Sequence, residues 1–145
     1  MRAVIQQVSQ AQVKVNGEKV SNIARGLLIF LAIKQDDEME KCQKMAQKIS
    51  KLRIFEDEND KMNLSVQDMI GEVLVVSQFT LYADTNSGNR PSFTNLAKPE
   101  KAKEYYLQVI NDLRDLGLKV KSGEFQKQMQ VNLINIGPKT IIIDL

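Results

Sequence analysis

The chain ends in a long apolar stretch, residues 129–143, that is interrupted by a Gly-Pro step. Residues 129–133 alternate between apolar and polar types, as a strand with one buried and one wetter face requires. Residues 140–143 are all β-branched, which also favours sheet. Proline cannot donate to a sheet hydrogen-bond ladder, so Gly137-Pro138 is either a turn between two strands or an interruption with a function. Spacing alone favours the turn.

The composition bounds the class of protein. With 145 residues and 43% hydrophobic residues, the chain is predicted to form a single domain, 1–145, with a real core. The longest apolar run, residues 27–33, is far shorter than the ~20 residues of a membrane span, and residues 1–4 lead directly into strand pattern without a signal peptide. We therefore expect a cytoplasmic protein with no membrane partner. Cys42, the single cysteine, lies on an apolar helical stripe and is predicted to be a core thiol.

The sequence contains no histidine. This excludes a Ser-His-Asp triad, a Cys-His pair and imidazole as a zinc ligand. An enzyme built from this chain would have to use backbone amides, hydroxyls, carboxylates, lysines or a group on the substrate. No motif calls for a metal or another cofactor, and none is predicted. The net charge of +2 is too small to indicate a nucleic-acid partner by itself.

Strand patterns dominate the first third of the chain. Residues 2–8 and 11–15 are predicted to be two strands, and Asn16-Gly17 is a strong hairpin signal that leads into residues 18–20. The continuous apolar run at 27–33 suits a strand that is buried on both faces, at the centre of the sheet.

Two amphipathic helices follow. The first carries apolar residues from Met39 to Leu52, with Asp37 and Glu40 as a possible capping box. The second begins near Pro99 and stops at Gly117. With short strands at 53–55 and 118–120, the pattern predicts an α+β fold with a largely antiparallel, barrel-like β-sheet and two packing α-helices.

A polar cluster closes the second hydrophobic strand, which is predicted over residues 72–81. Ser77, Gln78, Phe79 and Thr80 follow directly on four apolar residues, and a strand end is a rigid place to hold chemistry. An ordinary alternating strand explains them about as well. The long polar loop at 83–97 contains Arg90, which is either a phosphate or carboxylate contact or a surface arginine.

Four separated blocks carry a family resemblance. They are Ser77-Gln78-Phe79-Thr80-Leu81-Tyr82-Ala83-Asp84, Gly88-Asn89-Arg90-Pro91-Ser92-Phe93, Met129-Gln130-Val131 and Asn135-Ile136-Gly137-Pro138-Lys139-Thr140. In this order they resemble the D-aminoacyl-tRNA deacylase family, and the likeness extends to the opening Ala3-Val4-Ile5-Gln6 and to the total length.

The resemblance implies a homodimer that hydrolyses the ester joining a D-amino acid, or glycine, to the terminal ribose of tRNA. It implies that Gly137-Pro138 is cis and reaches into the partner's pocket, where its carbonyl oxygens exclude L-amino acids. The catalytic segment would be Ser77, Gln78, Phe79 and Thr80. Met129, Asn135 and Arg90 would bind the substrate.

Two mechanisms stay open. Thr80 could be the nucleophile, although no base is visible to activate it. We favour attack by water, assisted by the ribose 2′-hydroxyl, with a backbone N–H near Phe79 or Thr80 binding the ester carbonyl.

Two other functions also stay open. A deacylase of relaxed chirality is one, because the family usually has a basic residue where this chain has Gln7, an aspartate at Ile136 and an apolar residue at Lys139. The other is a nonenzymatic dimer that binds a tRNA end through basic side chains. Those side chains would be Lys41, Lys44, Lys48, Lys51 and Arg90.

Overall fold

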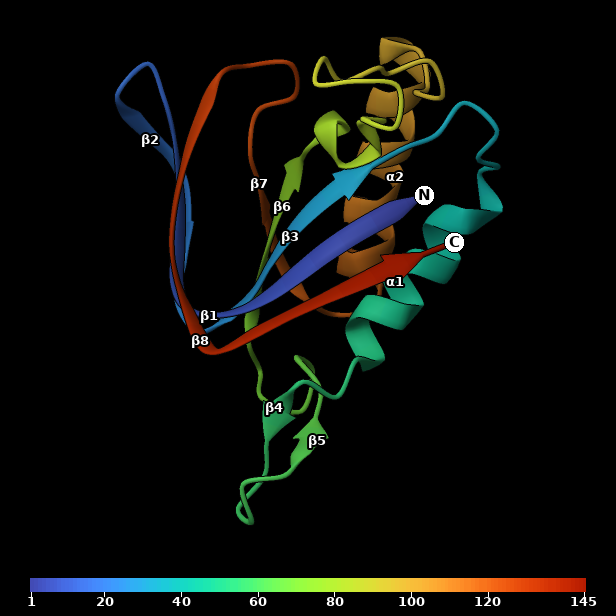
Figure 1. The fold of residues 1–145 in the computed structure, drawn as a ribbon. Helices are drawn as coiled ribbons and strands as arrows, with labels where there is room; N and C mark the ends of the chain where they lie inside the picture. The colour runs from blue at the N-terminus through green and yellow to red at the C-terminus, as the bar shows by residue number, and fades with distance from the viewer.

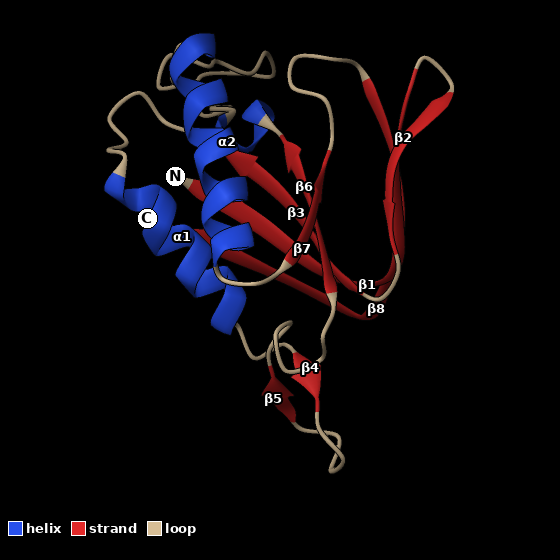
Figure 2. Cartoon of the chain, turned by 180° about the vertical axis from the view of Figure 1, so that it is seen from behind, coloured by secondary structure: helices blue, strands red, loops and turns tan.

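The computed structural model describes residues 1–145 and contains a mixed six-stranded sheet with two helices on one side (Figures 1 and 2). The strands of this sheet are β1 (Arg2–Val15), β2 (Glu18–Ile23), β3 (Gly26–Ala32), β6 (Glu72–Ser77), β7 (Lys119–Ser122) and β8 (Met129–Asp144). The other elements are α1 (Glu40–Lys51), α2 (Pro99–Asp115), the 3-10 helix η1 (Phe79–Tyr82) and a separate hairpin of β4 (Phe55–Glu56) and β5 (Met62–Leu64). The predicted α+β class and the two helices are confirmed.

The strand order is β2-β1-β3-β6-β7, and β8 pairs with the other edge of β1. Strand β1 is antiparallel to β2, β3 and β8, whereas the β3–β6 and β6–β7 pairs are parallel. The first half of β1 pairs with β3 and the second half with β2, so β1 and β8 bend together and fold the sheet over on itself (Figure 1). The result is the predicted barrel-like sheet, with β3 at its centre.

Two apolar clusters fill this architecture. The larger one lies between the sheet and the helices, and includes Ile5 and Ile29 from the sheet, Met45 from α1 and Val109 from α2. The smaller one lies inside the fold of the sheet. It consists of Val8, Ala11, Val13, Ile23, Leu28, Leu74 and Val76. Because side chains on a strand alternate between faces, β3 contributes to both clusters.

Three strand predictions need correction. Residues 2–8 and 11–15 form one continuous strand, β1, although its register against β8 shifts between them. The predicted strand at 72–81 ends at Ser77, and Phe79–Tyr82 turns into the 3-10 helix η1. A strand at Met62–Leu64 was not predicted. The hairpin at Asn16-Gly17 is confirmed, with both residues at positive φ (52° and 85°) as its turn requires.

Gly137-Pro138 is not a turn between two strands. Both limbs of β8 pair with the same strand, with Gln6 opposite Thr140 and Val8 opposite Asn135. Four residues of β8, 136–139, therefore face Gln7 alone. The Gly-Pro step is a bulge within one long strand.

The helix boundaries agree with those predicted from the sequence, but the predicted capping box is wrong. Helix α1 is preceded by Met39 and has no side-chain cap. Asp37 is instead buried, and its carboxylate accepts hydrogen bonds from the Met1 amine (2.6 Å), the Lys41 ammonium (2.8 Å) and the Lys34 amide (2.7 Å). Cys42 is a buried core thiol, as predicted. Neither helix has the length and apolar character that crossing a bilayer demands.

Replacing Asp37 with asparagine should lower the free energy of unfolding by about 3 kcal/mol at pH 7, because two cations lose their buried partner. Burial would raise the pKa of Asp37, but the hydrogen bonds from Lys41, the N-terminus and the Lys34 amide outweigh it, and the pKa lies below its ordinary 3.8. The contribution is therefore present above about pH 4 and lost as the pH falls through the folded-state pKa. Urea unfolding at pH 7 and pH 3 measures this.

The matched control is Asp36→Asn, which removes the same charge from an exposed neighbour. It should leave stability within about 0.5 kcal/mol of wild type. An equal loss in both variants, or a gap between wild type and Asp37→Asn that does not narrow between pH 7 and pH 3, would contradict this role of Asp37.

Tyr106 connects α2 to the centre of the sheet, and its hydroxyl can be tested separately. It is 2% exposed and donates a 2.8 Å hydrogen bond to the Val75 carbonyl on β6. That carbonyl also accepts the Gly123 amide at 2.9 Å, so it keeps one partner in Tyr106→Phe. We expect a loss of only about 1 kcal/mol in unfolding free energy, and almost none for Tyr105→Phe. A loss above about 3 kcal/mol would show that the hydroxyl does more.

Candidate active site

A cavity of about 960 Å³ opens where β3 and β6 end. Of its 17 lining residues 11 are hydrophobic. They are Leu31, Ala32, Ile33, Val76, Ser77, Gln78, Phe79, Leu96, Ala97, Pro99, Ala102, Phe125, Gln126, Lys127, Gln128, Met129 and Val131. Four predicted site residues therefore come together here. Ser77 ends β6, Gln78 and Phe79 follow it into η1, and Met129 begins β8.

The rim at Ser77–Thr80 is fixed by its neighbours. Ser77 pairs with Leu31 on β3, and the Gln78 amide donates to the Leu31 carbonyl at 2.9 Å. Because β3 ends at Ala32, no further ladder is available and the chain turns into η1. The Gln78 side-chain amide donates to the Thr80 hydroxyl, which does not itself line the cavity.

Side chains from outside β6 hold η1 in place. The Arg2 guanidinium donates to the Leu81 carbonyl at 3.0 Å and lies over the Tyr82 ring, 5.0 Å from its centroid. Phe79, 56% exposed, makes an edge-on contact with Phe93 at a centroid distance of 5.2 Å. The long loop after η1, which the sequence singled out, is thereby attached to the cavity rim.

The backbone N–H groups of Phe79 and Thr80 are the first two of the 3-10 helix η1. A 3-10 turn joins each N–H to the carbonyl three residues earlier, so the first N–H groups of such a helix have no acceptor within it. They are available to a negatively charged or strongly polarised oxygen. They are donors near the cavity that do not depend on a side chain.

The cavity has few groups that can transfer protons. Lys127 is the single charged side chain among the lining residues. No cluster of three or more His, Cys, Asp or Glu side chains suited to a metal ion is present. Apart from Lys127, acid–base chemistry in this cavity depends on water or on a group that the substrate brings.

No pattern in the sequence pointed to the far wall of the cavity, Phe125–Gln128. Phe125 packs against the buried Tyr106, with ring centroids 5.8 Å apart, and Gln126 has a positive φ of 61°. These residues form the connection between β7 and β8, which has no periodicity and no motif. Their proximity to Ser77 arises from the parallel pairing of β6 with β7, which places the end of β7 beside the end of β6.

The other predicted site residues lie elsewhere in the chain. Gly137-Pro138 is a cis peptide on the exposed bulge of β8, opposite Gln7. Gln7 pairs with Leu27 at the start of β3, whereas the cavity is at the end of β3. Asn135 lies at the base of the bulge, where its side chain accepts a hydrogen bond from the Lys139 amide at 2.9 Å and donates one to the Thr140 hydroxyl at 3.1 Å. Arg90 is exposed and does not line the cavity.

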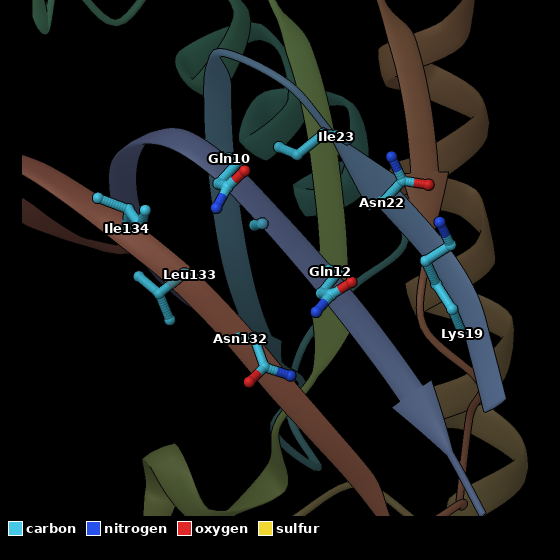
Figure 3. Close-up of a pocket in the computed structure, with 9 residues that line it drawn as sticks. Gln10, Gln12, Lys19, Asn22, Ile23, Asn132, Leu133 and Ile134 are labelled. Carbon is cyan, nitrogen blue, oxygen red and sulfur yellow. The ribbon is translucent and has the colours of Figure 1, made fainter. Parts of the chain in front are cut away.

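A smaller pocket of about 260 Å³ lies on β1, β2 and the first limb of β8 (Figure 3). Amide side chains are prominent in it, among them Gln10, Gln12, Asn22 and Asn132, together with Lys19 (Figure 3). It shares no residue with the larger cavity or with the predicted site.

Comparisons with known proteins identify the family. Residues 4–144 match the family described as D-Tyr-tRNA(Tyr) deacylase. A D-aminoacyl-tRNA deacylase of Thermotoga petrophila is 55% identical over 144 residues, 99% of this chain and 97% of that protein. One of Colwellia psychrerythraea is 52% identical over the full length of both chains. The solved structure of a c-Myc DNA unwinding element binding protein superposes with a TM-score of 0.94 at 40% identity, covering 100% of this chain and 99% of that one. The chain belongs to the D-Tyr-tRNA(Tyr) deacylase family.

Proposed function

We propose that this protein hydrolyses the ester bond of D-aminoacyl-tRNA, and of glycyl-tRNA mischarged on tRNA(Ala), releasing free tRNA and the amino acid. The observation that carries the proposal is the largely apolar cavity at the end of β6, which is lined by Phe79. The amide of Phe79, like that of the next residue, Thr80, has no backbone acceptor. Such a site suits an ester whose carbonyl becomes an oxyanion. The family membership supports the same reaction.

The proposed chemistry uses the backbone and the substrate. Water attacks the ester carbonyl, and the Phe79 and Thr80 N–H groups stabilise the developing oxyanion. The 2′-hydroxyl of the terminal ribose assists the proton transfers, because the chain has no histidine to do so. The bond from the carbonyl carbon to the ribose oxygen then breaks. Ser77 and Gln78 shape the rim, Thr80 positions the substrate, and Met129 contacts it in the cavity. Asn135 would contact it from the bulge of a second subunit, and Arg90, which lies outside the cavity, would contact a phosphate of the tRNA.

Chiral selection is assigned to the main chain of Gly137-Pro138, acting in the pocket of a second subunit. Met129 in the cavity and Gly137 in the bulge are eight positions apart on β8, about 26 Å at a strand rise of about 3.3 Å per residue. Gly137-Pro138 therefore needs another copy of the chain to reach a cavity. Main-chain carbonyl oxygens reject a side chain of the wrong hand without reading its identity, and glycine, which has no side chain, passes.

The surface of β8 supports the homodimer. None of its 16 residues is buried, and the strand has no partner on the edge away from β1. Ile134, Ile136 and Ile142 are 49%, 39% and 62% exposed. Apolar side chains along an open strand are the kind of surface that a second subunit covers.

The proposed substrate is made in translation, and we therefore propose that the protein acts in the cytoplasm.

The first test compares D- and L-tyrosyl-tRNA as substrates of the purified protein. We expect rapid loss of the D-ester and protection of the L-ester by at least two orders of magnitude. Pro138→Ala frees the φ angle that the ring fixes, so the carbonyl oxygens are held less firmly and the L-ester should be cleaved at least tenfold faster. Equal cleavage of both esters by wild type would instead indicate the deacylase of relaxed chirality, with Gln7 as its sequence feature.

The second test separates the two mechanisms. If the 2′-hydroxyl assists and Thr80 only positions, Thr80→Ala should keep at least a tenth of the wild-type rate. A D-aminoacyl-tRNA ending in 2′-deoxyadenosine, acylated at the 3′-oxygen, should lose at least 100-fold. The reverse pattern, in single-turnover assays at saturating enzyme, would make Thr80 the nucleophile.

A nonenzymatic nucleic-acid-binding dimer is the second candidate, favoured by the similarity to the c-Myc DNA unwinding element binding protein. Its predicted lysine row is only partly free, because Lys41 bonds Asp37 and Lys44 bonds Glu40, while Lys48 and Lys51 are exposed. Salt-sensitive tRNA binding without cleavage of any ester would favour this candidate.

A further inference from the structure

The bulge that carries Gly137-Pro138 is exposed, yet one of its residues is anchored. Ile136, Gly137 and Pro138 are all exposed, whereas the Lys139 side chain retains only 15% of its accessible surface. Its ammonium lies 2.7 Å from the Glu56 carboxylate on β4. Lys139 therefore connects the bulge to the separate β4–β5 hairpin, 83 residues earlier in the chain.

The stem of Lys139 also lies against Gly137. A Cβ built on Gly137 would come within 2.7 Å of Lys139 Cγ and 3.3 Å of Lys139 Cε. Gly137 has a positive φ of 116°, a conformation that favours glycine. As a glycine it has no side chain with which to fix the backbone there. The methylene groups of Lys139 occupy that side of the glycine and limit where its carbonyl can move.

Strand β1 supplies little to hold the bulge. Gln7, the one β1 residue opposite it, is 2% exposed, and its side-chain oxygen has no hydrogen-bond partner. The hydrogen bonds at the base of the bulge come from β8 itself and from Gln6, which donates to the Thr140 hydroxyl at 3.1 Å. The Lys139–Glu56 ion pair is the contact that ties the bulge to another part of the molecule.

We propose that Lys139 is a positioning residue for the Gly137-Pro138 filter, which it holds against the β4–β5 hairpin through its ion pair with Glu56. The inference rests on the proposed function of that filter. Glu56 acts on the bulge only through Lys139. Figure 1 shows the β4–β5 hairpin below the bend of β8. The ion pair leaves Ile136, Gly137 and Pro138 exposed, so these residues stay open to a second subunit.

The experiment measures the ratio of D- to L-tyrosyl-tRNA hydrolysis in Lys139→Met, Glu56→Gln and the double variant. Methionine keeps the stem and removes the charge. Each single change should lower the D/L ratio about threefold to fivefold, mainly through faster cleavage of the L-ester, as expected for a partly exposed ion pair. The double variant should be no worse than either single one, because both remove the same contact.

Controls separate positioning from general stability. Glu58→Gln removes a neighbouring exposed carboxylate of the same hairpin and should keep the wild-type ratio. Exchanging the charges, Lys139→Glu with Glu56→Lys, should recover part of the ratio that either reversal alone loses. Amide hydrogen exchange, which does not depend on activity, should be faster at Lys139 in Lys139→Met and Glu56→Gln than in wild type.

The outcomes are distinct for the two proposals. A wild-type protein that cleaves both esters equally would overturn the chiral filter itself. The second outcome is a wild-type protein that discriminates between the two esters. If Lys139→Met and Glu56→Gln then keep the wild-type D/L ratio and the wild-type amide exchange rates, the role of Lys139 is overturned and the filter remains intact.

Discussion

The antiparallel pairing of β1 with β8 is the contact on which the rest of the structure depends. It runs from Arg2 opposite Asp144 to Val15 opposite Met129, and joins the two ends of the chain into one ribbon. The ribbon bends around the register shift at Gln7. At that bend the pairing partner of β1 changes from β3 to β2. The sheet therefore closes over the smaller apolar cluster instead of remaining flat. The same shift produces the bulge that carries Gly137-Pro138.

The cavity follows from the strand ends that this arrangement brings together. The parallel strands β3 and β6 end at the same edge, and β8 begins there, so polar rim and apolar wall come from segments far apart in the sequence. In an apolar cavity a backbone N–H interacts more strongly with developing charge than it would in water. A site without histidine can therefore stabilise an oxyanion, provided that the substrate supplies the group that moves protons.

The sequence predicted those parts of the fold that depend on local pattern. Both helices, the hairpin at Asn16-Gly17 and the buried strand at Gly26–Ala32 follow from periodicity and turn residues. It failed where distant contacts decide the structure. Asp37 looked like a helix cap, and nothing local could show that the amine of Met1 and the end of the chain would meet it.

The candidate site shows the same division. Ser77, Gln78 and Phe79 were found because they interrupt an apolar strand, and Met129 because of the family resemblance. The alternating pattern of residues 77–82 fits a strand as well as a 3-10 turn. The chain adopts the 3-10 turn because β3 ends at Ala32 and does not continue the ladder alongside residues 79–82. The wall at Phe125–Gln128 had no signal, since a connecting segment gains its position from the strands on either side.

A filter made of main-chain atoms places an unusual demand on its surroundings. Gly137 and Pro138 have no side-chain hydrogen bonds with which to fix themselves, yet steric selection requires their carbonyl oxygens to stay within a few tenths of an ångström. The residues that can satisfy this demand are the flanking ones, Asn135 through the Lys139 amide and Lys139 through its stem and charge. In the proposed filter, selectivity would therefore depend on these flanking residues as well as on the Gly-Pro step.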